Sequence, residues 1–180
     1  LIVVYESEQS DFAMRIFNAD GSEPEMCGNG IRCFAKFIYD TKLTQKDVMT
    51  VETLAGIMVP GLILTNGEVS SIEVDMGEPI LSGKKIPIDI DKEPIIGHPI
   101  TIKGEELSFT GVSMGNPHAI FFTEDTQSIA LTTLGPEIES HPLFPNKTNV
   151  EFVQVLNKNE AKMIVWERGA AETMACGTGA

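Results

Sequence analysis

The chain has 180 residues, enough for one large domain or two small ones, and its 42% hydrophobic and 22% charged content indicates a soluble globular protein. A formal net charge of −13 argues against nucleic acid or an anionic membrane as a partner, because like charges repel. No apolar run is long enough to span a membrane, and no signal peptide is visible. A small anionic substrate is still allowed, because a pocket can be locally positive.

The first half is expected to combine short strands with one buried helix. Residues 28–40 predict the helix, because apolar side chains recur there at helical spacing. These side chains are Ile31, Phe34, Ala35, Phe37 and Ile38. Asn66-Gly67 is a strong hairpin signal. Strands are expected on either side of these features, over residues 1–5, 12–18, 48–54, 57–64 and 69–76.

The pattern breaks at Gly77-Glu78-Pro79, where we place the boundary between two halves, residues 1–76 and residues 77–180. A short helix is expected over residues 131–141, started or interrupted by Pro136. Each half thus has strands, a loop and a Cys-Gly-x-Gly motif that leads into a helix. Strands of the second half are expected over residues 107–114, 119–122, 150–156 and 161–167.

The three cysteines are unevenly spaced and do not make a disulfide framework. Cys27 and Cys33 are wrongly spaced for a zinc ribbon, and only three histidines are available, so no metal site is expected. Reduced thiols in the cytoplasm are the simpler interpretation. Cys33 lies inside the apolar helical pattern, and we expect it to be a small buried hydrophobic residue.

The same short motif occurs twice, as Cys27-Gly28-Asn29-Gly30 and as Cys176-Gly177-Thr178-Gly179. A cysteine at a helix N-terminus lies near free backbone N–H groups and the positive end of the helix dipole, and both favour its thiolate. The glycines let the backbone approach a ligand and leave N–H groups open to a carboxylate. The N–H groups expected to hold a substrate carboxylate are those of Gly28, Asn29, Gly177 and Thr178.

Two such thiols are suited to proton transfer on a single carbon. If one is a thiolate and the other a thiol, one removes a proton from one face and the other delivers a proton to the opposite face, which inverts a stereocentre. N–H groups at the carboxylate would stabilise the carbanion, so no cofactor is needed. Two other classes remain open. One is a cysteine hydrolase or acyl transferase with His118 as its base, and the other is a non-catalytic relative whose thiols form a redox-sensitive disulfide.

Three stretches of the chain carry a resemblance to a known family. The first joins Phe17-Asn18-Ala19-Asp20-Gly21-Ser22-Glu23 to Cys27-Gly28-Asn29-Gly30-Ile31-Arg32-Cys33, the second is Gly115-Asn116-Pro117-His118, and the third runs from Glu167-Arg168-Gly169-Ala170 to Ala175-Cys176-Gly177-Thr178-Gly179. In order and spacing these stretches resemble the diaminopimelate epimerase family over essentially the whole chain. The resemblance implies an isomerase, independent of pyridoxal phosphate, that interconverts LL- and meso-2,6-diaminopimelate on the route to lysine and peptidoglycan.

The resemblance also implies an α/β (α+β) fold of two similar halves, each a mostly antiparallel sheet or barrel around a central helix, with the active site in the cleft between them. Family members carry a further strand-rich segment upstream and continue past the second cysteine, so we expect the chain to be a fragment that is inactive by itself. Its expected partner is the small-molecule substrate, and a homodimer is allowed. The expected location is the cytoplasm, or a plastid if the source is a plant or an alga.

By this resemblance, Cys27 and Cys176 are the catalytic pair, and His118 and Glu167 tune which thiol is ionised. The distal end of the substrate, which does not react, carries an ammonium and a carboxylate. Arg168 suits that carboxylate because a guanidinium binds it in bidentate fashion, and asparagine amides offer both donors and acceptors. The residues implied to bind the distal end are Asn18, Asn116, Asn149, Glu167 and Arg168.

Simpler interpretations stay open for three of these residues. His118 suits a hydrogen-bonded core histidine, Asn149 a turn or cap residue, and Arg168 a surface salt bridge. The alternative function is that of proline racemases and hydroxyproline epimerases, which share the fold and the two cysteines. They typically have His in place of Asn29 and Asp-Arg-Ser-Pro before the second cysteine, where this chain has Glu172-Thr173-Met174-Ala175. Both differences favour diaminopimelate epimerase.

Overall fold

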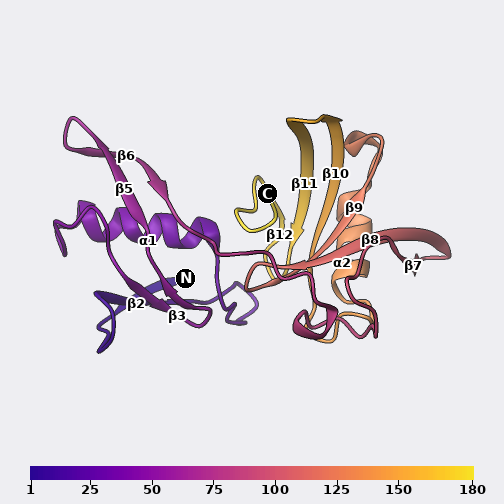
Figure 1. Ribbon diagram of the computed structural model, residues 1–180, viewed down its shortest axis with the longest axis horizontal. Coiled ribbons are helices and arrows are strands. Elements are labelled where there is room, and N and C mark those ends of the chain that lie inside the picture. The colour runs from indigo at the N-terminus through magenta and orange to yellow at the C-terminus, as the bar shows by residue number, and fades with distance from the viewer. The chain divides into compact units, whose positions relative to one another are not determined.

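The computed structural model describes residues 1–180 and divides into two compact units, Leu1–Gly77 and Glu78–Ala180 (Figure 1). Gly77 ends the first unit with a φ of 77°, in the left-handed region that glycine adopts without strain. Each unit combines several strands with a single α-helix, so the predicted mixed α/β class is confirmed. No helix in the structure is both long enough and apolar enough to cross a membrane.

The first unit contains β1 (Ile2–Tyr5), β2 (Phe12–Ile16), α1 (Gly28–Asp40), β3 (Val51–Thr53), β4 (Gly56–Met58), β5 (Gly61–Thr65) and β6 (Glu68–Glu73). Four strands form a mixed sheet in the order β1-β2-β3-β4. The pair β2/β3 is parallel and therefore needs a crossover connection, which contains α1. Strands β5 and β6 form a separate hairpin, and Figure 1 shows α1 lying between this hairpin and the sheet.

One face of α1 carries the core of the first unit. Its buried side chains follow the spacing of an amphipathic helix and meet apolar side chains from both the sheet and the hairpin. The predicted helix over residues 28–40 is thereby confirmed. The buried side chains of the helix are Ile31, Phe34, Ala35 and Ile38, and they pack with Met14, Ile16, Met26, Met49, Val51 and Leu62.

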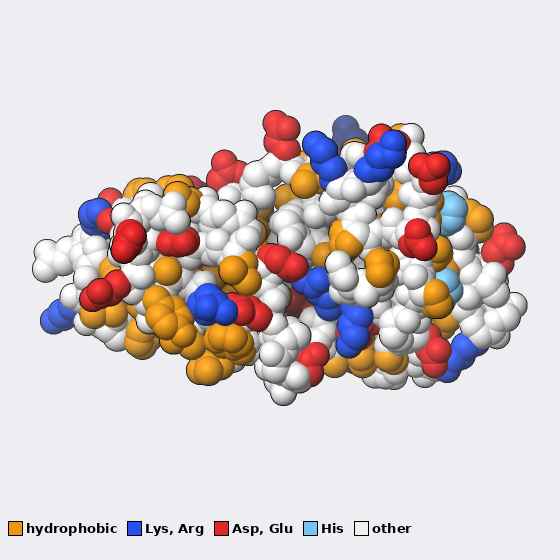
Figure 2. Space-filling view, turned by 90° about the horizontal axis from the view of Figure 1, so that it is seen from below, with side chains coloured by type: hydrophobic (Ala, Val, Ile, Leu, Met, Phe, Trp, Pro, Cys, Tyr) orange, Lys and Arg blue, Asp and Glu red, His pale blue; other side chains and the backbone are white.

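The flank of α1 is open, and here the sequence-based expectation was wrong. Cys33 is exposed and Phe37 is 53% exposed, so the helix is not buried on all of its apolar positions. Both side chains line an open hollow beside Ile2 and Val4 of β1, because the buried stripe is only wide enough for the i, i+3, i+4, i+7 positions. Figure 2 shows hydrophobic side chains gathered at the surface of the first unit, on the left of the view.

The turns of the first unit largely follow the sequence signals. Asn66 and Gly67 connect β5 to β6 with φ values of 54° and 83°, as a tight hairpin turn requires, so that prediction is confirmed. The strand expected over residues 48–54 begins only at Val51. Val48 instead forms an isolated bridge with Gly61.

The second unit contains the 3-10 turns η1 (Gly83–Lys85) and η2 (Thr126–Ser128), β7 (His98–Ile102), β8 (Glu105–Ser113), β9 (Pro117–Phe122), α2 (Leu131–Glu139), β10 (Asn149–Asn157), β11 (Glu160–Glu167) and β12 (Ala171–Thr173). One sheet holds the strands in the order β12-β11-β10-β9-β8-β7. Only the pair β9/β10 is parallel, and its crossover contains α2. Strand β12 was not expected from the sequence.

Pro136 lies inside α2 and neither starts nor breaks it, contrary to the expectation. The helix continues past the proline, because the N–H of Ser140 donates to the carbonyl of Pro136 at 3.2 Å. Burial of Leu131 and Ile138 against the sheet holds this short helix together, as tertiary packing does for most short helices. Gly135 allows α2 to lie close to β11, because a Cβ on Gly135 would be 2.6 Å from the ring of Trp166.

The alternation of side chains along β9 and β10 separates a core face from a polar face. Ala119, Phe121, Val150 and Phe152 belong to the apolar core of the unit, together with residues of α2. The residues that alternate with these core residues point to the other face of the sheet, because strand side chains alternate. They include His118, Asn149 and Glu151. The parallel register places Asn149 beside His118. Buried polar side chains therefore gather on the face opposite α2.

Candidate active site

In the first unit, Cys27 is the N-cap residue of α1. Its backbone is extended, with φ −141° and ψ 112°, and its sulfur accepts the N–H of Gly30 at 3.2 Å. A side chain at position 30 would be tightly packed, because a Cβ on Gly30 would lie 3.1 Å from Ile16 and 3.3 Å from the Cys27 sulfur. The side chain of Cys27 is half-buried. The thiol is thus held at the end of the helix where backbone N–H groups point outward.

The other expected site residues of the first unit lie in the same loop-to-helix region. Gly28 and Asn29 open the first turn of α1, and the side-chain oxygen of Asn29 accepts a hydrogen bond from Arg32. Asn18 follows β2 and closes a tight loop, in which its N–H donates to the carbonyl of Ser22 at 2.8 Å. Its side-chain amide donates to the Ser22 hydroxyl at 3.1 Å. The loop therefore holds Asn18 in a defined position before Cys27.

In the second unit, Cys176 lies on the segment that covers the polar face of the sheet. Its side chain is buried, at 4% exposure, and its sulfur is 3.4 Å from the hydroxyl of Thr178. The following turn packs closely, because a Cβ on Gly179 would lie 2.6 Å from Oε1 of Glu151. The repeated Cys-Gly-x-Gly motif therefore gives a half-buried sulfur in one unit and a buried sulfur in the other.

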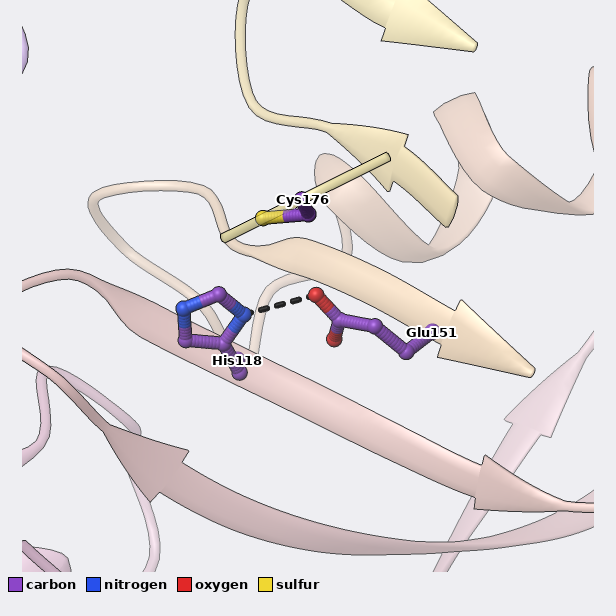
Figure 3. Close-up of side chains that lie close together, drawn as sticks. All are labelled: His118, Glu151 and Cys176. Carbon is purple, nitrogen blue, oxygen red and sulfur yellow. Dashed lines mark hydrogen bonds and ion pairs between the residues drawn. The ribbon is translucent and has the colours of Figure 1, made fainter. Parts of the chain in front are cut away.

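A chain of hydrogen bonds links Cys176 to the sheet beneath it. The amide nitrogen of Asn116 donates to the Thr178 hydroxyl at 3.1 Å, and the amide oxygen of Asn116 lies 3.0 Å from Nε2 of His118. Nδ1 of His118 is in turn 2.6 Å from Oε1 of Glu151. Figure 3 shows His118 on β9, Glu151 on β10 and the Cys176 sulfur beside the pair. All five side chains are buried.

Burial changes the pKa of two groups in this chain of hydrogen bonds. The pKa of the Cys176 thiol is raised from 9.0 to about 11, mainly by burial; the hydrogen bond with Thr178 opposes the rise, and the nearby carboxyls of Glu167 and Glu151 contribute to it. Burial also raises the pKa of the Glu151 carboxyl, while the hydrogen bond with His118 lowers it. Cys176 is therefore a neutral thiol near pH 7, which makes it a proton donor rather than a base.

Asn149, Glu167 and Arg168 lie at the same end of the sheet. The amide of Asn149 joins neighbouring strands, since its nitrogen donates to the carbonyl of Pro117 at 2.9 Å and its oxygen accepts the N–H of Arg168 at 2.9 Å. This is a buried cross-link rather than the turn or cap residue that the sequence allowed. The Glu167 carboxylate accepts the hydroxyl of Thr173 at 2.5 Å, and the Arg168 guanidinium donates to a backbone carbonyl at 3.3 Å.

Comparison with known proteins now identifies the family. A sequence profile described as Diaminopimelate epimerase matches residues 1–82 and 110–180. The chain belongs to the diaminopimelate epimerase family. The predicted resemblance is confirmed, and the two matched stretches include both cysteine motifs and the hydrogen-bonded chain from Asn116 to Cys176.

Similar sequences in this family match the chain from end to end. The diaminopimelate epimerase of Moorella thermoacetica is 58% identical over 180 residues, covering 100% of this chain and 64% of the relative. That of Desulfitobacterium hafniense is 53% identical with the same coverage, and that of Methanococcus maripaludis strain S2 is 54% identical and covered to 65%. The chain thus spans just under two thirds of the length of these relatives.

Similar solved structures confirm the fold of this chain. A probable proline racemase from Agrobacterium radiobacter K84, with bound carbonate, gives a TM-score of 0.73 at 15% identity, covering 99% of this chain and 56% of that one. A hydroxyproline epimerase from Agrobacterium vitis, with bound trans-4-hydroxy-L-proline, gives 0.73 at 16% identity with the same coverage. At this identity the likeness concerns the fold alone.

Sequence reasoning missed Glu151 and the hydroxyl of Thr178. Glu151 lies between Val150 and Phe152 in a strand where apolar residues alternate with polar ones, so the pattern places it on the same face as Asn149. That alternation is the signal that could have found it. The contact between Thr178 and Cys176 has no such signal, because it depends on how the loop after β12 folds back over the sheet.

His118, Glu151 and Cys176 also form a group of metal-ligating atoms, which lie within 4.8 Å of one another. The 2.6 Å between the histidine nitrogen and the glutamate oxygen is a hydrogen-bond distance. Two ligands of a tetrahedral zinc ion would stand about 3.3 Å apart, given metal–ligand bonds of about 2.0 Å. The cluster therefore fits a proton shared between two side chains better than it fits a metal ion.

Proposed function

We propose that the full-length protein containing this chain epimerises LL-2,6-diaminopimelate to meso-diaminopimelate, with Cys27 and Cys176 as its two acid–base groups. The observation that carries the proposal is the contrast between the two thiols of a repeated motif. Cys27 caps a helix and accepts a backbone N–H, whereas Cys176 is buried and protonated. One base and one acid are what inversion at a carbon needs. The relatives named diaminopimelate epimerase support this choice of substrate.

The proposed reaction begins with Cys27 as the thiolate and Cys176 as the thiol. Cys27 takes the proton from the reacting carbon, and Cys176 gives its proton to the opposite face of the same carbon. The products are a Cys27 thiol and a Cys176 thiolate, and the reverse reaction restores the starting state. The substrate carboxylate, held by N–H groups of Gly28, Asn29, Gly177 and Thr178, would take up the negative charge of the intermediate. No cofactor enters these steps.

Recognition of the distal end is assigned in the proposal to Asn18, Asn116, Asn149, Glu167 and Arg168. Asn116 and Asn149 each use one amide hydrogen within the protein, which leaves a second hydrogen on each nitrogen available for a substrate carboxylate. A site with these groups would discriminate against a substrate that lacks the distal ammonium and carboxylate, since its buried polar atoms would be left unpaired. His118 and Glu167 are proposed to adjust the ionisation of the thiols.

The proposed setting is the cytoplasm, where thiols stay reduced. The chain is proposed to act as two halves that divide near residues 76–77, and the whole enzyme as a homodimer is a further prediction. Its proposed partner is the small-molecule substrate, with no nucleic acid and no membrane.

The test is solvent proton exchange by the full-length protein in heavy water. LL-diaminopimelate is added without pyridoxal phosphate, and the Cα proton is followed by NMR beside samples with proline and 4-hydroxyproline. Loss of the signal with diaminopimelate alone, together with formation of the meso isomer, is the expected result. Cys27→Ala and Cys176→Ala should each abolish epimerisation, whereas a hydrolase would depend on only one cysteine. Exchange with proline or hydroxyproline instead would overturn the assigned substrate.

A further inference from the structure

The two-thiol reaction does not use the most deeply buried acid of the second unit. Glu151 has 0% exposure, and one of its oxygens, Oε2, has no hydrogen-bond partner. Its other oxygen is 2.6 Å from Nδ1 of His118. A buried carboxyl with an unsatisfied oxygen is costly, and such a group persists only where it does something that an apolar side chain cannot do.

The hydrogen bonds from Glu151 to Cys176 have a definite direction. The short contact between Nδ1 and Oε1 requires one proton between them, whether it is bonded to the nitrogen or to the oxygen. The atom of Asn116 that faces Nε2 of His118 is the amide oxygen, which can only accept, so Nε2 carries a hydrogen and donates to it at 3.0 Å. Nδ1 then either accepts a hydrogen bond from the protonated carboxyl of Glu151 or, in an imidazolium, donates to its carboxylate. The amide nitrogen of Asn116 then faces Thr178 and donates to its hydroxyl oxygen.

The direction of the chain decides what Thr178 offers to the sulfur. Because its oxygen accepts from Asn116, Thr178 keeps its own hydroxyl hydrogen to give to the Cys176 sulfur, 3.4 Å away, and a thiolate at that position can only accept it. If His118 carried its single ring hydrogen on Nδ1 instead, the Asn116 amide would have to turn over. The amide oxygen of Asn116 would then accept the Thr178 hydrogen, and the Cys176 sulfur would lose its hydrogen-bond donor.

We infer that Glu151 is a positioning residue, which acts through His118 and Asn116 to keep the Thr178 hydroxyl as a hydrogen-bond donor to the sulfur of Cys176. The inference deepens the proposed function and rests on it for its catalytic meaning. When Cys176 gives its proton to the substrate carbon, its sulfur becomes negative inside a buried site. The Thr178 hydrogen then stabilises this thiolate, without any proton leaving the chain.

The charged and titratable groups that face Glu151 come from three elements. His118 faces it from β9, Cys176 from the covering segment, and Glu167 from the end of β11. As a simple negative charge, Glu151 would disfavour the Cys176 thiolate, so removing the charge would make the sulfur more reactive. As the residue that sets the chain's direction, it favours the thiolate, so its removal would make the sulfur less reactive. The two roles predict opposite results.

The test is the alkylation rate of Cys176 in the full-length protein, which needs no substrate. Iodoacetamide is applied between pH 7 and pH 11, and each cysteine is quantified by peptide mass spectrometry. Glu151→Met keeps roughly the volume of the side chain and removes the group that fixes Nδ1 of His118, and we expect it to slow alkylation of Cys176 about 10-fold, the effect of losing a hydrogen bond to a charged group. Cys27 in the same sample is an internal control, and Glu106→Met on the exposed surface of β8 is the matched variant. Faster or unchanged alkylation of Cys176 would overturn the inference.

A second variant covers the case in which Glu151→Met fails to fold. Thr178→Val removes only the last donor of the chain and should slow alkylation of Cys176 by a similar factor. In the double variant the two effects should not add, because both act through the same hydrogen bond. Additive effects would mean that Glu151 acts by another route.

Histidine resonances give a readout that a merely structural role would not change. In the 15N-labelled full-length protein, comparison with a His118 variant assigns the ring nitrogens of His118. We expect a slowly exchanging hydrogen on Nε2 of His118 in the parent protein and not in Glu151→Met, and its presence in both would contradict the inference. Glu151→Met should also lower kcat for diaminopimelate about 10-fold while KM changes less. If the parent protein does not epimerise diaminopimelate but the alkylation and NMR results hold, the hydrogen-bonded chain stands and only the proposed function fails.

Discussion

The raised pKa of Cys176 makes protein stability depend on alkaline pH in a way that a single substitution can isolate. The folded protein holds the thiol proton up to about pH 11, whereas the unfolded chain releases it near 9.0. The stability associated with the neutral buried thiol is therefore fully present below pH 9 and is lost as pH rises from 9 through 11. A shift of about two units corresponds to roughly 3 kcal/mol in the free energy of unfolding.

The measurement is urea unfolding of the parent protein and Cys176→Ala under reducing conditions, at intervals from pH 8 to pH 11. Other groups titrate in both proteins, so the difference between the two free energies of unfolding isolates Cys176. We expect the parent protein to lose about 2 kcal/mol of stability relative to Cys176→Ala between pH 8 and pH 11, because the folded thiol is only half ionised at pH 11. Curves that stay parallel over this range would refute a buried neutral thiol at this position.

Close contacts and exposure give three further predictions. Gly135→Ala places a Cβ 2.6 Å from the ring of Trp166 and should destabilise the protein by about 1–3 kcal/mol in thermal or urea unfolding; an unchanged midpoint would show that α2 lies farther from the sheet. Gly179→Ala places a Cβ 2.6 Å from Oε1 of Glu151 and should lower epimerase activity at least about 10-fold, measured as proton exchange, and activity at the parent level would contradict this contact. Cys33→Ser should retain parental proton-exchange activity, because Cys33 is exposed on the flank of α1, and loss of activity would give it a role that its position does not suggest.

Much of the fold was predictable because local signals and tertiary packing agree. The helix over residues 28–40 has an apolar face at helical spacing, and the Asn66-Gly67 turn needs residues that adopt positive φ. The strand β12 was missed because residues 171–173 have no strong strand pattern and pair with β11 only through the sheet. The expectation for Pro136 was wrong because propensity alone cannot show that packing against the sheet sustains a short helix around it.

Cys33 and Phe37 show a limit of periodicity. Apolar residues at positions 31, 34, 35, 37 and 38 predict a helix with a wide buried stripe. The sheet and the hairpin cover only part of this stripe. Periodicity identifies which residues share a face, but the width of the buried face depends on the neighbouring elements. Only the three-dimensional arrangement of β1 beside α1 shows that these two side chains line an open hollow.

The two cysteines show why the chemistry of a site cannot be taken from a motif alone. Cys27 and Cys176 are each followed by Gly-x-Gly, and the sequence predicted the same geometry for both. In the structure, Cys27 caps a helix and takes a backbone N–H, while Cys176 is buried beside Thr178 and two carboxyls. The difference comes from residues far along the chain, since Glu151 and Glu167 lie on strands and reach Cys176 only in the folded protein.

In the proposed reaction, this asymmetry bears on which isomer of diaminopimelate the resting protein can accept. A symmetric pair of thiols would have no preferred direction, whereas a protonated Cys176 can only donate in the first step. If the proposed reaction holds, the resting form is suited to the diastereomer whose Cα proton is taken by Cys27, and the opposite diastereomer requires the proton to move between the thiols first. Single-turnover exchange in heavy water should therefore show a burst with one isomer of diaminopimelate and a lag with the other near pH 7. Because the pKa of Cys176 is about 11, the lag should shorten as pH rises toward that value. Equal time courses for both isomers at every pH would argue against a fixed resting proton on Cys176.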